Sequence, residues 1–114
     1  MIKGKIVLVP FPFDNLREAK VRPAVCLTNP IGPHRHVILA FITSRIPADL
    51  AETDVILRSE DPDFKVTGLK VTSVIRLHRL MTVSTSLILR ELGELPRSKQ
   101  EEVDDKLHKL FELP

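Results

Sequence analysis

The most informative chemical feature of the sequence is Arg22, which stands directly before Pro23 in the segment VRPAVCLT. A residue that precedes proline avoids the helical region, so we expect Arg22 to project from extended backbone. Its guanidinium is planar, permanently charged and carries five donors, and it can therefore bind two oxygens of one phosphate group. The alternative is an arginine that lies along the surface of a strand with its charged end in water.

In an extended strand, Ala24 and Cys26 share a face with Arg22, because successive side chains alternate. Both side chains are small, so we expect a shallow depression beside the guanidinium. Cys26 is the only cysteine of the chain and cannot form an internal disulfide. Within a strand we interpret it as a packed, inert thiol rather than a nucleophile.

Two adjacent hydroxyl residues, Thr43 and Ser44, follow the apolar run VILAFI at residues 37–42. Either hydroxyl could donate a hydrogen bond to a phosphate, but in a regular strand only one of them shares a face with Arg22. The alternative is structural: Thr43 ends the strand, and Ser44 caps the turn that leads to Pro47.

The histidines offer weaker candidates. His78 lies in a β-prone stretch and could act as a general base, although a histidine that makes a structural hydrogen bond is the alternative. His34 and His36 have H-x-H spacing, yet no other ligands stand near them in the sequence, and we interpret them as a loop pair. A phosphate-binding glycine loop and a CxxC pair are both absent from the sequence, so we expect neither a cofactor nor a metal.

The charge of the chain is concentrated at one end. Residues 1–46 carry seven Lys or Arg against two acidic residues, whereas residues 47–70 carry six acidic residues against three basic ones. A basic N-terminal third suits a polyanionic ligand, although scattered solvated charges would give the same count. The basic residues that could follow a phosphate backbone are Arg17, Lys20, Arg35 and Arg45.

Hydrophobic patterning predicts strands at residues 5–10, 21–28, 36–44, 55–57, 70–83 and 87–95, with a bend or bulge at Gly93. Residues 97–112 have the pattern of an amphipathic helix, and Ser98 with Glu101 has capping-box spacing. A length of 114 residues suits one domain. We therefore predict a mainly β (α+β) domain over residues 1–114, with a small curved barrel at about 1–96 and a C-terminal helix.

The apolar segments are all short. The longest uninterrupted one is residues 37–42, far below the roughly 18 residues of a membrane-spanning helix. The N-terminus has no apolar signal segment, and the single cysteine fits a reducing compartment. We therefore expect a soluble, cytoplasmic protein that does not associate with membranes.

Five segments together resemble the MazF/PemK family, the toxins of type II toxin–antitoxin systems. In chain order they are GKIVLVPF at residues 4–11, RPAV at 22–25, ITS at 42–44, LKVTSVIRL at 69–77 and GEL at 93–95. The resemblance implies an SH3-like barrel, commonly a homodimer, that acts as a ribosome-independent, sequence-selective endoribonuclease on single-stranded RNA. It also implies a cognate antitoxin protein as partner.

Within that resemblance, Arg22 matches the arginine of the family's R-P motif and Thr43 matches the hydroxyl residue that closes the third strand. These are the two catalytic positions, whereas Ser44 and His78 are possible catalytic or supporting residues. Many relatives have an acidic residue where this chain has Lys5. Two non-nuclease alternatives stay open: an RNA- or peptide-binding module, and a relative that poisons DNA gyrase through its C-terminal helix.

The expected chemistry needs no metal. The 2′-hydroxyl of the substrate attacks the adjacent phosphorus and expels the 5′-oxygen, which leaves a 2′,3′-cyclic phosphate. Arg22 and Thr43 would stabilise the charge that develops on the non-bridging oxygens. The base that takes the 2′-proton is unassigned, with His78, Asp14 and Glu18 as candidates.

Overall fold

The computed structural model describes residues 2–11 and 20–114 of the chain. Arg17, Asp14 and Glu18, which the sequence singled out, lie outside these ranges. The strands are β1 (Lys5–Phe11), β2 (Lys20–Cys26), β3 (His36–Thr43), β4 (Asp54–Leu57), β5 (Ser73–Ser84) and β6 (Arg90–Glu94). The helices are the short 3₁₀ segments η1 (Phe64–Thr67) and η2 (Thr85–Leu87) and the α-helix α1 (Arg97–Leu110).

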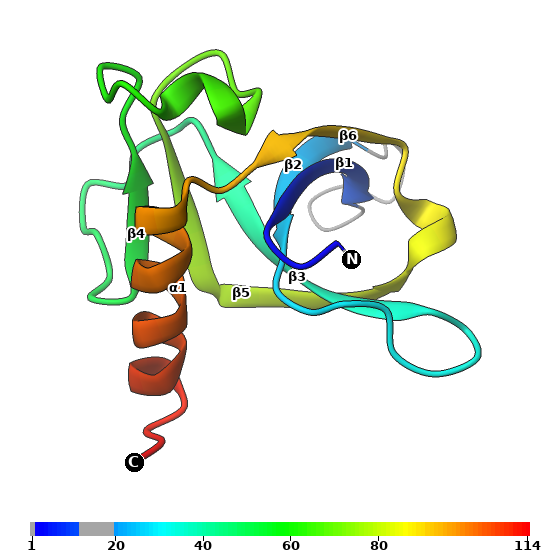
Figure 1. The fold of residues 1–114 in the computed structure, drawn as a ribbon. Coiled ribbons are helices and arrows are strands. Elements are labelled where there is room, and N and C mark those ends of the chain that lie inside the picture. Colours follow the sequence, from blue (N-terminus) through cyan, green and yellow to red (C-terminus); the bar gives the residue numbers. More distant parts are fainter. Residues whose placement is uncertain (1, 12–19) are drawn as a thin grey trace.

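The six strands form one antiparallel sheet in the order β4-β5-β3-β2-β1-β6, and the sheet curls into a half-barrel (Figure 1). The helix α1 lies beside β4 and β5. Strand β3 is flanked by β5 and β2, which explains why its sequence is apolar on both faces. The predicted small curved β-structure with a C-terminal helix is confirmed. Both 3₁₀ segments were absent from the prediction.

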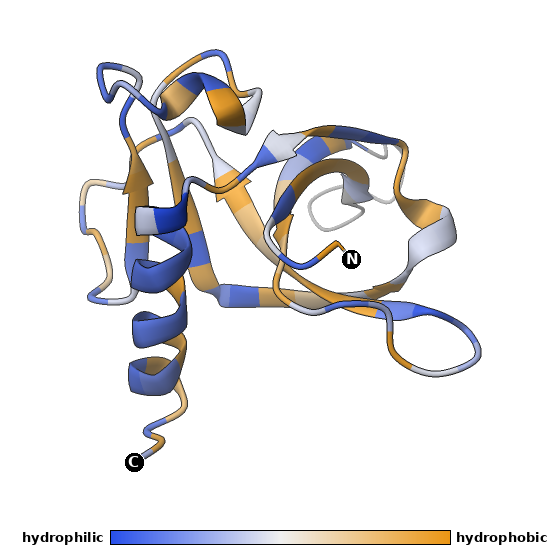
Figure 2. Ribbon diagram, viewed as in Figure 1, coloured by the Kyte–Doolittle hydropathy of each residue, from blue (hydrophilic) through white to orange (hydrophobic). Residues whose placement is uncertain are grey.

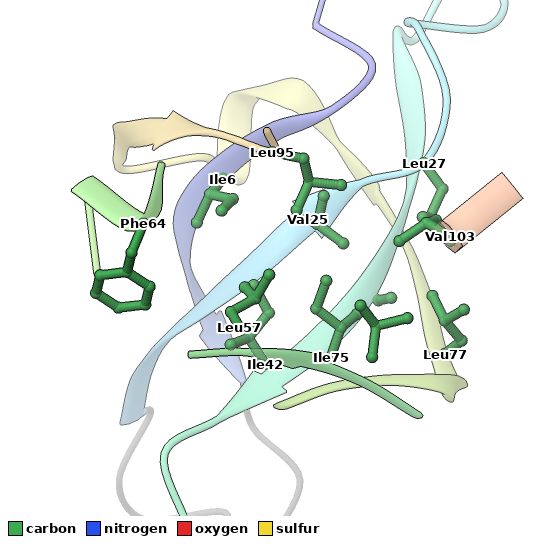
Figure 3. Close-up of a cluster of buried hydrophobic side chains, with 12 residues drawn as sticks. Ile6, Val25, Leu27, Ile42, Leu57, Phe64, Ile75, Leu77, Leu95 and Val103 are labelled. Atoms are coloured by element: carbon green, nitrogen blue, oxygen red, sulfur yellow. The ribbon is translucent and has the colours of Figure 1, made fainter. Parts of the chain in front are cut away.

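The main hydrophobic core lies between the sheet, η1 and α1. The side chains labelled in Figure 3 point toward one another from the sheet, from η1 and from α1, which contributes the fully buried Val103. A second cluster covers the other face of the sheet, where Val7, Ala24 and Cys26 alternate with the side chains of the first. Burial on both faces holds the central strands rigid at the edge where the candidate residues lie.

A bulge occurs in β6, as the sequence predicted at Gly93. The partners of Ile6 and Val7 step from Gly93 to Glu91, which leaves one residue of β6 unpaired. A methyl group at Gly93 would collide with the backbone of η1, including the carbonyl carbon of Thr67 at 2.6 Å. Glycine is therefore required here because η1 packs directly on β6.

The helix α1 begins one residue earlier than its predicted cap. Pro96 is the N-cap and offers no side-chain hydrogen bond, so the predicted capping box at Ser98 is wrong. Glu102 pairs with Lys106 at 2.8 Å, and both side chains are partly buried because Lys106 Nζ also donates to the carbonyl oxygen of Asp54 at 2.7 Å. Figure 2 shows α1 as predominantly hydrophilic. Within residues 2–11 and 20–114, no helix is long and apolar enough to cross a membrane.

Candidate functional site

The register of β2 against β3 brings Arg22 and Thr43 together. The two strands pair Ala24 with Phe41, and the same antiparallel register carried two residues further sets Arg22 opposite Thr43. Residues that face each other across a ladder point to the same side of the sheet. The two residues that the sequence proposed as catalytic therefore lie on neighbouring strands and share a face.

These two residues line a groove with a volume of about 640 Å³. The side chains that line it are Lys20, Val21, Arg22, Phe41, Thr43, Arg45 and Arg79. Four of the seven are basic and none is acidic. In the described part of the chain, none of the four basic side chains forms an ion pair. Among the described residues, the groove therefore carries a positive charge without an acidic partner, and it attracts anions.

Phe41 lies beneath two of the cationic groups. The guanidinium carbon Cζ of Arg22 is 5.7 Å from the centre of the Phe41 ring, and that of Arg79 is 5.0 Å from it. Both distances are within the range of a cation–π interaction. The ring is only 9% exposed, so it serves as a fixed support for the two guanidinium groups.

The predicted depression beside Arg22 is built differently from the expectation. Ala24 and Cys26 are 0% and 1% exposed and belong to the second hydrophobic cluster, so neither lines the groove. The reason is cross-strand packing, because the partner of Ala24 on β3 is the large Phe41. Burial, and to a lesser extent the charge of Glu91, raises the pKa of Cys26 to about 11, which agrees with a packed, inert thiol.

Thr43 combines a structural bond with an available proton. Its Oγ1 accepts a hydrogen bond from the backbone N–H of Arg45 at 3.1 Å and lies 3.5 Å from the carbonyl oxygen of Arg45. The first bond shapes the turn after β3, and the second distance is at the limit for a hydrogen bond. The hydroxyl proton of Thr43 can therefore turn toward a ligand in the groove. Ser44 is exposed but is not among the lining residues.

The remaining basic candidates separate into two groups. Lys20 and Arg45 line the groove from the start of β2 and the residues after β3. Arg35 instead precedes His36 at the other end of β3. A strand of eight residues spans about 25 Å at roughly 3.3 Å per residue, so Arg35 lies far from the groove.

The histidines lie outside the groove. The rings of His34 and His36 are 5.8 Å apart, centre to centre, in the connection that leads into β3. Among the described residues, no group of three or more His, Cys, Asp or Glu side chains is arranged to hold a metal ion. The role of His78 stays a prediction, and its position is next to Asp54.

Asp54 is a buried charged residue that the sequence reasoning missed. Its side chain is 1% exposed, and its Oδ1 lies 3.0 Å from Nε of Arg76 and 4.0 Å from Nδ1 of His78. Its Oδ2 accepts the backbone N–H of Ala51 at 2.8 Å. The sequence signal was an acidic residue directly before the apolar run VIL. Asp54 thus ties β4 to β5 close to the groove.

Lys5 also has a structural explanation. Its Nζ lies 3.7 Å from a carboxylate oxygen of Glu91 and 3.8 Å from one of Glu94, both on the neighbouring strand β6. Such partly exposed pairs contribute little to stability individually. Lys5 does not line the groove.

Comparison with known proteins agrees with the fold. A profile of the PemK-like, MazF-like toxins of type II toxin–antitoxin systems matches residues 2–111. No protein with a curated description matches the chain in sequence.

Solved structures share the fold over nearly the whole chain. The toxin MazF-mt6 of Mycobacterium tuberculosis superposes with a TM-score of 0.73 at 21% identity, covering 96% of this chain and 98% of the toxin. MazF of Deinococcus radiodurans superposes with a TM-score of 0.70 at 21% identity, covering 99% of this chain and 97% of that MazF. A mycobacterial endoribonuclease, solved in complex with its cognate antitoxin, superposes with a TM-score of 0.71 at 14% identity, covering 100% of this chain and 97% of the endoribonuclease. The chain therefore belongs to the PemK-like, MazF-like toxins of type II toxin–antitoxin systems.

Proposed function

We propose that this toxin is an endoribonuclease that cuts single-stranded RNA at selected sequences without a metal ion. The observation that carries the proposal is the groove, in which Arg22 and Thr43 face the same space together with three further basic side chains, none of which has an acidic partner among the described residues. RNA is a polyanion, and a single strand can lay its phosphates along such a surface. A structural relative of this chain is itself described as an endoribonuclease.

The reaction follows from the groups that line the groove. The 2′-oxygen of the substrate forms a bond to the adjacent phosphorus while the bond from phosphorus to the 5′-oxygen breaks. The leaving 5′-oxygen takes a proton from solvent water, and the products are a 2′,3′-cyclic phosphate and a 5′-hydroxyl. Arg22 donates paired hydrogen bonds to the non-bridging oxygens, where negative charge accumulates, and Thr43 donates another. Arg22 acts electrostatically, because its pKa is too high for ready proton donation.

Proton removal from the 2′-hydroxyl needs a separate group. Among the described residues that line the groove there is neither a carboxylate nor an imidazole. His78 lies beside Asp54, and Asp14 and Glu18 precede Lys20 in the sequence but lie outside the described residues. The base therefore has three candidates. His78 directly precedes the groove residue Arg79 in the sequence, whereas Glu18 and Asp14 stand two and six residues before Lys20.

The proposal includes a partner and an assembly. A cognate antitoxin would neutralise the toxin by placing an acidic, extended segment in the groove, where it meets the same cations as RNA. The structure of a mycobacterial endoribonuclease in complex with its cognate antitoxin supports an antitoxin as the partner. We propose a homodimer as the active form and the cytoplasm, where RNA is available, as its location.

A module that binds RNA without cutting it is the alternative function. It would require that both Arg22 and Thr43 be fully used within the fold. The Thr43 hydroxyl donates only a long hydrogen bond, 3.5 Å to the carbonyl oxygen of Arg45, which a ligand oxygen could replace, and Arg22 has no carboxylate partner among the described residues. Both observations favour cutting over binding alone.

The test compares two strands in EDTA. One is a single-stranded RNA, and the other is the same strand with a 2′-deoxy substitution at the mapped cleavage position. We expect cleavage of the first only, with a 2′,3′-cyclic phosphate detected by mass spectrometry. Arg22→Ala should lower kcat by about 10²- to 10³-fold. Equal cleavage of both strands, or a folded Arg22→Ala protein with full activity, would refute the mechanism.

A further inference from the structure

The strand β5 contains an irregularity that places an additional cation in the groove. Along most of its length β5 pairs regularly with β3, but between Ala40 and Phe41 the partner steps from Leu80 to Arg76. Three residues of β5, 77–79, therefore lack a partner on β3. Such irregularities commonly redirect a side chain. Here the redirected side chain is Arg79, which contacts the Phe41 ring from within the groove.

Arg22 and Arg79 thus come from strands on opposite sides of β3 and meet on one ring. Their Cζ atoms can be no farther apart than the sum of 5.7 and 5.0 Å, because both distances are measured to the same ring centre. Like charges this close repel each other, and in the described part of the chain no acidic side chain compensates them. A pair of this kind is prepared for an anionic ligand with more than one charge.

The residues before Arg79 are anchored. Asp54 Oδ1 lies 3.0 Å from Arg76 Nε and 4.0 Å from His78 Nδ1, and the carboxylate is almost completely buried. The ion pair with Arg76, together with the β4–β5 pairing of Asp54 with Arg76, holds β5 at residue 76, where its register against β3 shifts. The position of Arg79 is therefore determined by the fold before any ligand binds, which lowers the entropic cost of binding.

Resting on the proposed function, we propose that Arg79 binds the phosphate next to the one held by Arg22, and that Phe41 positions both guanidinium groups. Successive phosphates of one strand lie close enough for two such neighbouring cations. Arg22 acts on the phosphate where charge develops during cleavage. Arg79 contributes equally to the ground and transition states, so its contribution is to binding.

The test is a binding measurement with an RNA that cannot be cut, a fluorescent single strand with a 2′-deoxy substitution at the reactive position. In a series of otherwise identical strands, each phosphate in turn is replaced by a neutral methylphosphonate. For the unaltered protein we expect the largest losses of affinity, about tenfold each, at two adjacent positions, and smaller losses at the phosphates that face Lys20 and Arg45. In Arg79→Gln, methylphosphonate at one of these positions should no longer lower the affinity. In Arg22→Ala, methylphosphonate at the other position should no longer lower it.

Phe41 is tested by two substitutions. Phe41→Tyr keeps the ring, so methylphosphonate at each of the two positions should still lower the affinity for RNA as it does in the unaltered protein. Phe41→Leu removes the ring, so both methylphosphonate effects should become smaller. Thermal unfolding checks that the Phe41→Leu protein is folded. Arg97→Gln, a matched change on the exposed start of α1, should behave as the unaltered protein. The inference is overturned if both methylphosphonate positions still lower the RNA affinity of Arg79→Gln. It is also overturned if Phe41→Leu binds the series of RNAs as Phe41→Tyr does. Because binding is measured without cleavage, an absence of cutting would refute the proposed function and leave this result intact.

Discussion

Replacing Arg45 by glutamine should reduce the salt dependence of RNA binding by a calculable amount. Each phosphate of a single strand that a protein cation neutralises contributes about −0.7 to the slope of log K against log salt concentration. The groove is lined by four cations that have no ion-pair partner among the described residues, Lys20, Arg22, Arg45 and Arg79, so the slope should be about −2.8 if each neutralises one phosphate. A rise from about 50 to about 200 mM salt should then weaken binding about 50-fold.

Arg45→Gln removes one of the four cations and should change the slope to about −2.1, which reduces the same loss to about 20-fold. The assay is fluorescence anisotropy with the uncleavable RNA at four or five salt concentrations. Arg97→Gln is the matched control, because Arg97 is highly exposed on α1 and does not line the groove. An identical slope for Arg45→Gln and the unaltered protein would refute the assignment of the groove as the RNA site.

Arg35→Gln adds a second comparison. Arg35 lies at the other end of β3, so its replacement should leave the slope unchanged if RNA occupies only the groove. A fall in slope equal to that of Arg45→Gln would show that the RNA continues along β3 to the far end. The two variants therefore measure the length of the binding track.

Three further predictions concern the scaffold. Val103→Ala removes two methyl groups from the buried contact of α1 and should lower the free energy of unfolding by about 2 kcal/mol. Urea denaturation measures this change, and an unchanged midpoint of the unfolding curve would show that α1 packs loosely. Burial alone would raise the pKa of Glu102, but hydrogen bonds from Lys106 and Lys99 outweigh it and lower the pKa below 4.5. The stability that this carboxylate adds is present above pH 4.5, the pKa in the unfolded chain, and is lost as the pH falls through the lower pKa of the folded protein. The difference in Tm between the unaltered protein and Glu102→Gln should therefore shrink between pH 6 and pH 3. The Cys26 thiol, with a pKa of about 11, should resist iodoacetamide at pH 8 in the folded protein and react after denaturation; rapid native labelling would contradict its burial.

The strands could be predicted because their patterns are local. The apolar run at 37–42 indicated a central strand, and β3 is flanked by strands on both sides. Gly93 indicated a bulge, which β6 contains. Arg22 and Thr43 could each be singled out, one by the proline that follows it and the other by its place after the apolar run.

The geometry that joins these residues could not be predicted, because it depends on register. The connection between β2 and β3 is nine residues long, from 27 to 35, and a loop of that length does not fix which residues face each other. The same limit applies to Arg79, whose position depends on the register shift between β3 and β5. Phe41 read as one more apolar residue of a central strand, because nothing in its neighbours along the chain indicates two arginines above its ring.

Asp54 connects this scaffold to the groove and gives the last prediction. Asp54→Asn keeps an oxygen that can accept the N–H of Ala51 but removes the negative charge beside Arg76. Removal of one partner from a fully buried pair costs 3–5 kcal/mol, and because the Arg76 side chain is 21% exposed we expect about 2 kcal/mol. Asp49→Asn, an exposed acidic residue in the segment before β4, is the matched control.

The consequence for RNA binding separates two roles of Asp54. If the carboxylate only stabilises the fold, Asp54→Asn should bind RNA normally well below its unfolding temperature. If it also fixes the register shift that directs Arg79, the folded variant should lose the methylphosphonate effect that depends on Arg79 and keep the one that depends on Arg22. We expect the second result, because Arg76, whose Nε lies 3.0 Å from the Asp54 carboxylate, is the residue at which the register of β5 against β3 shifts.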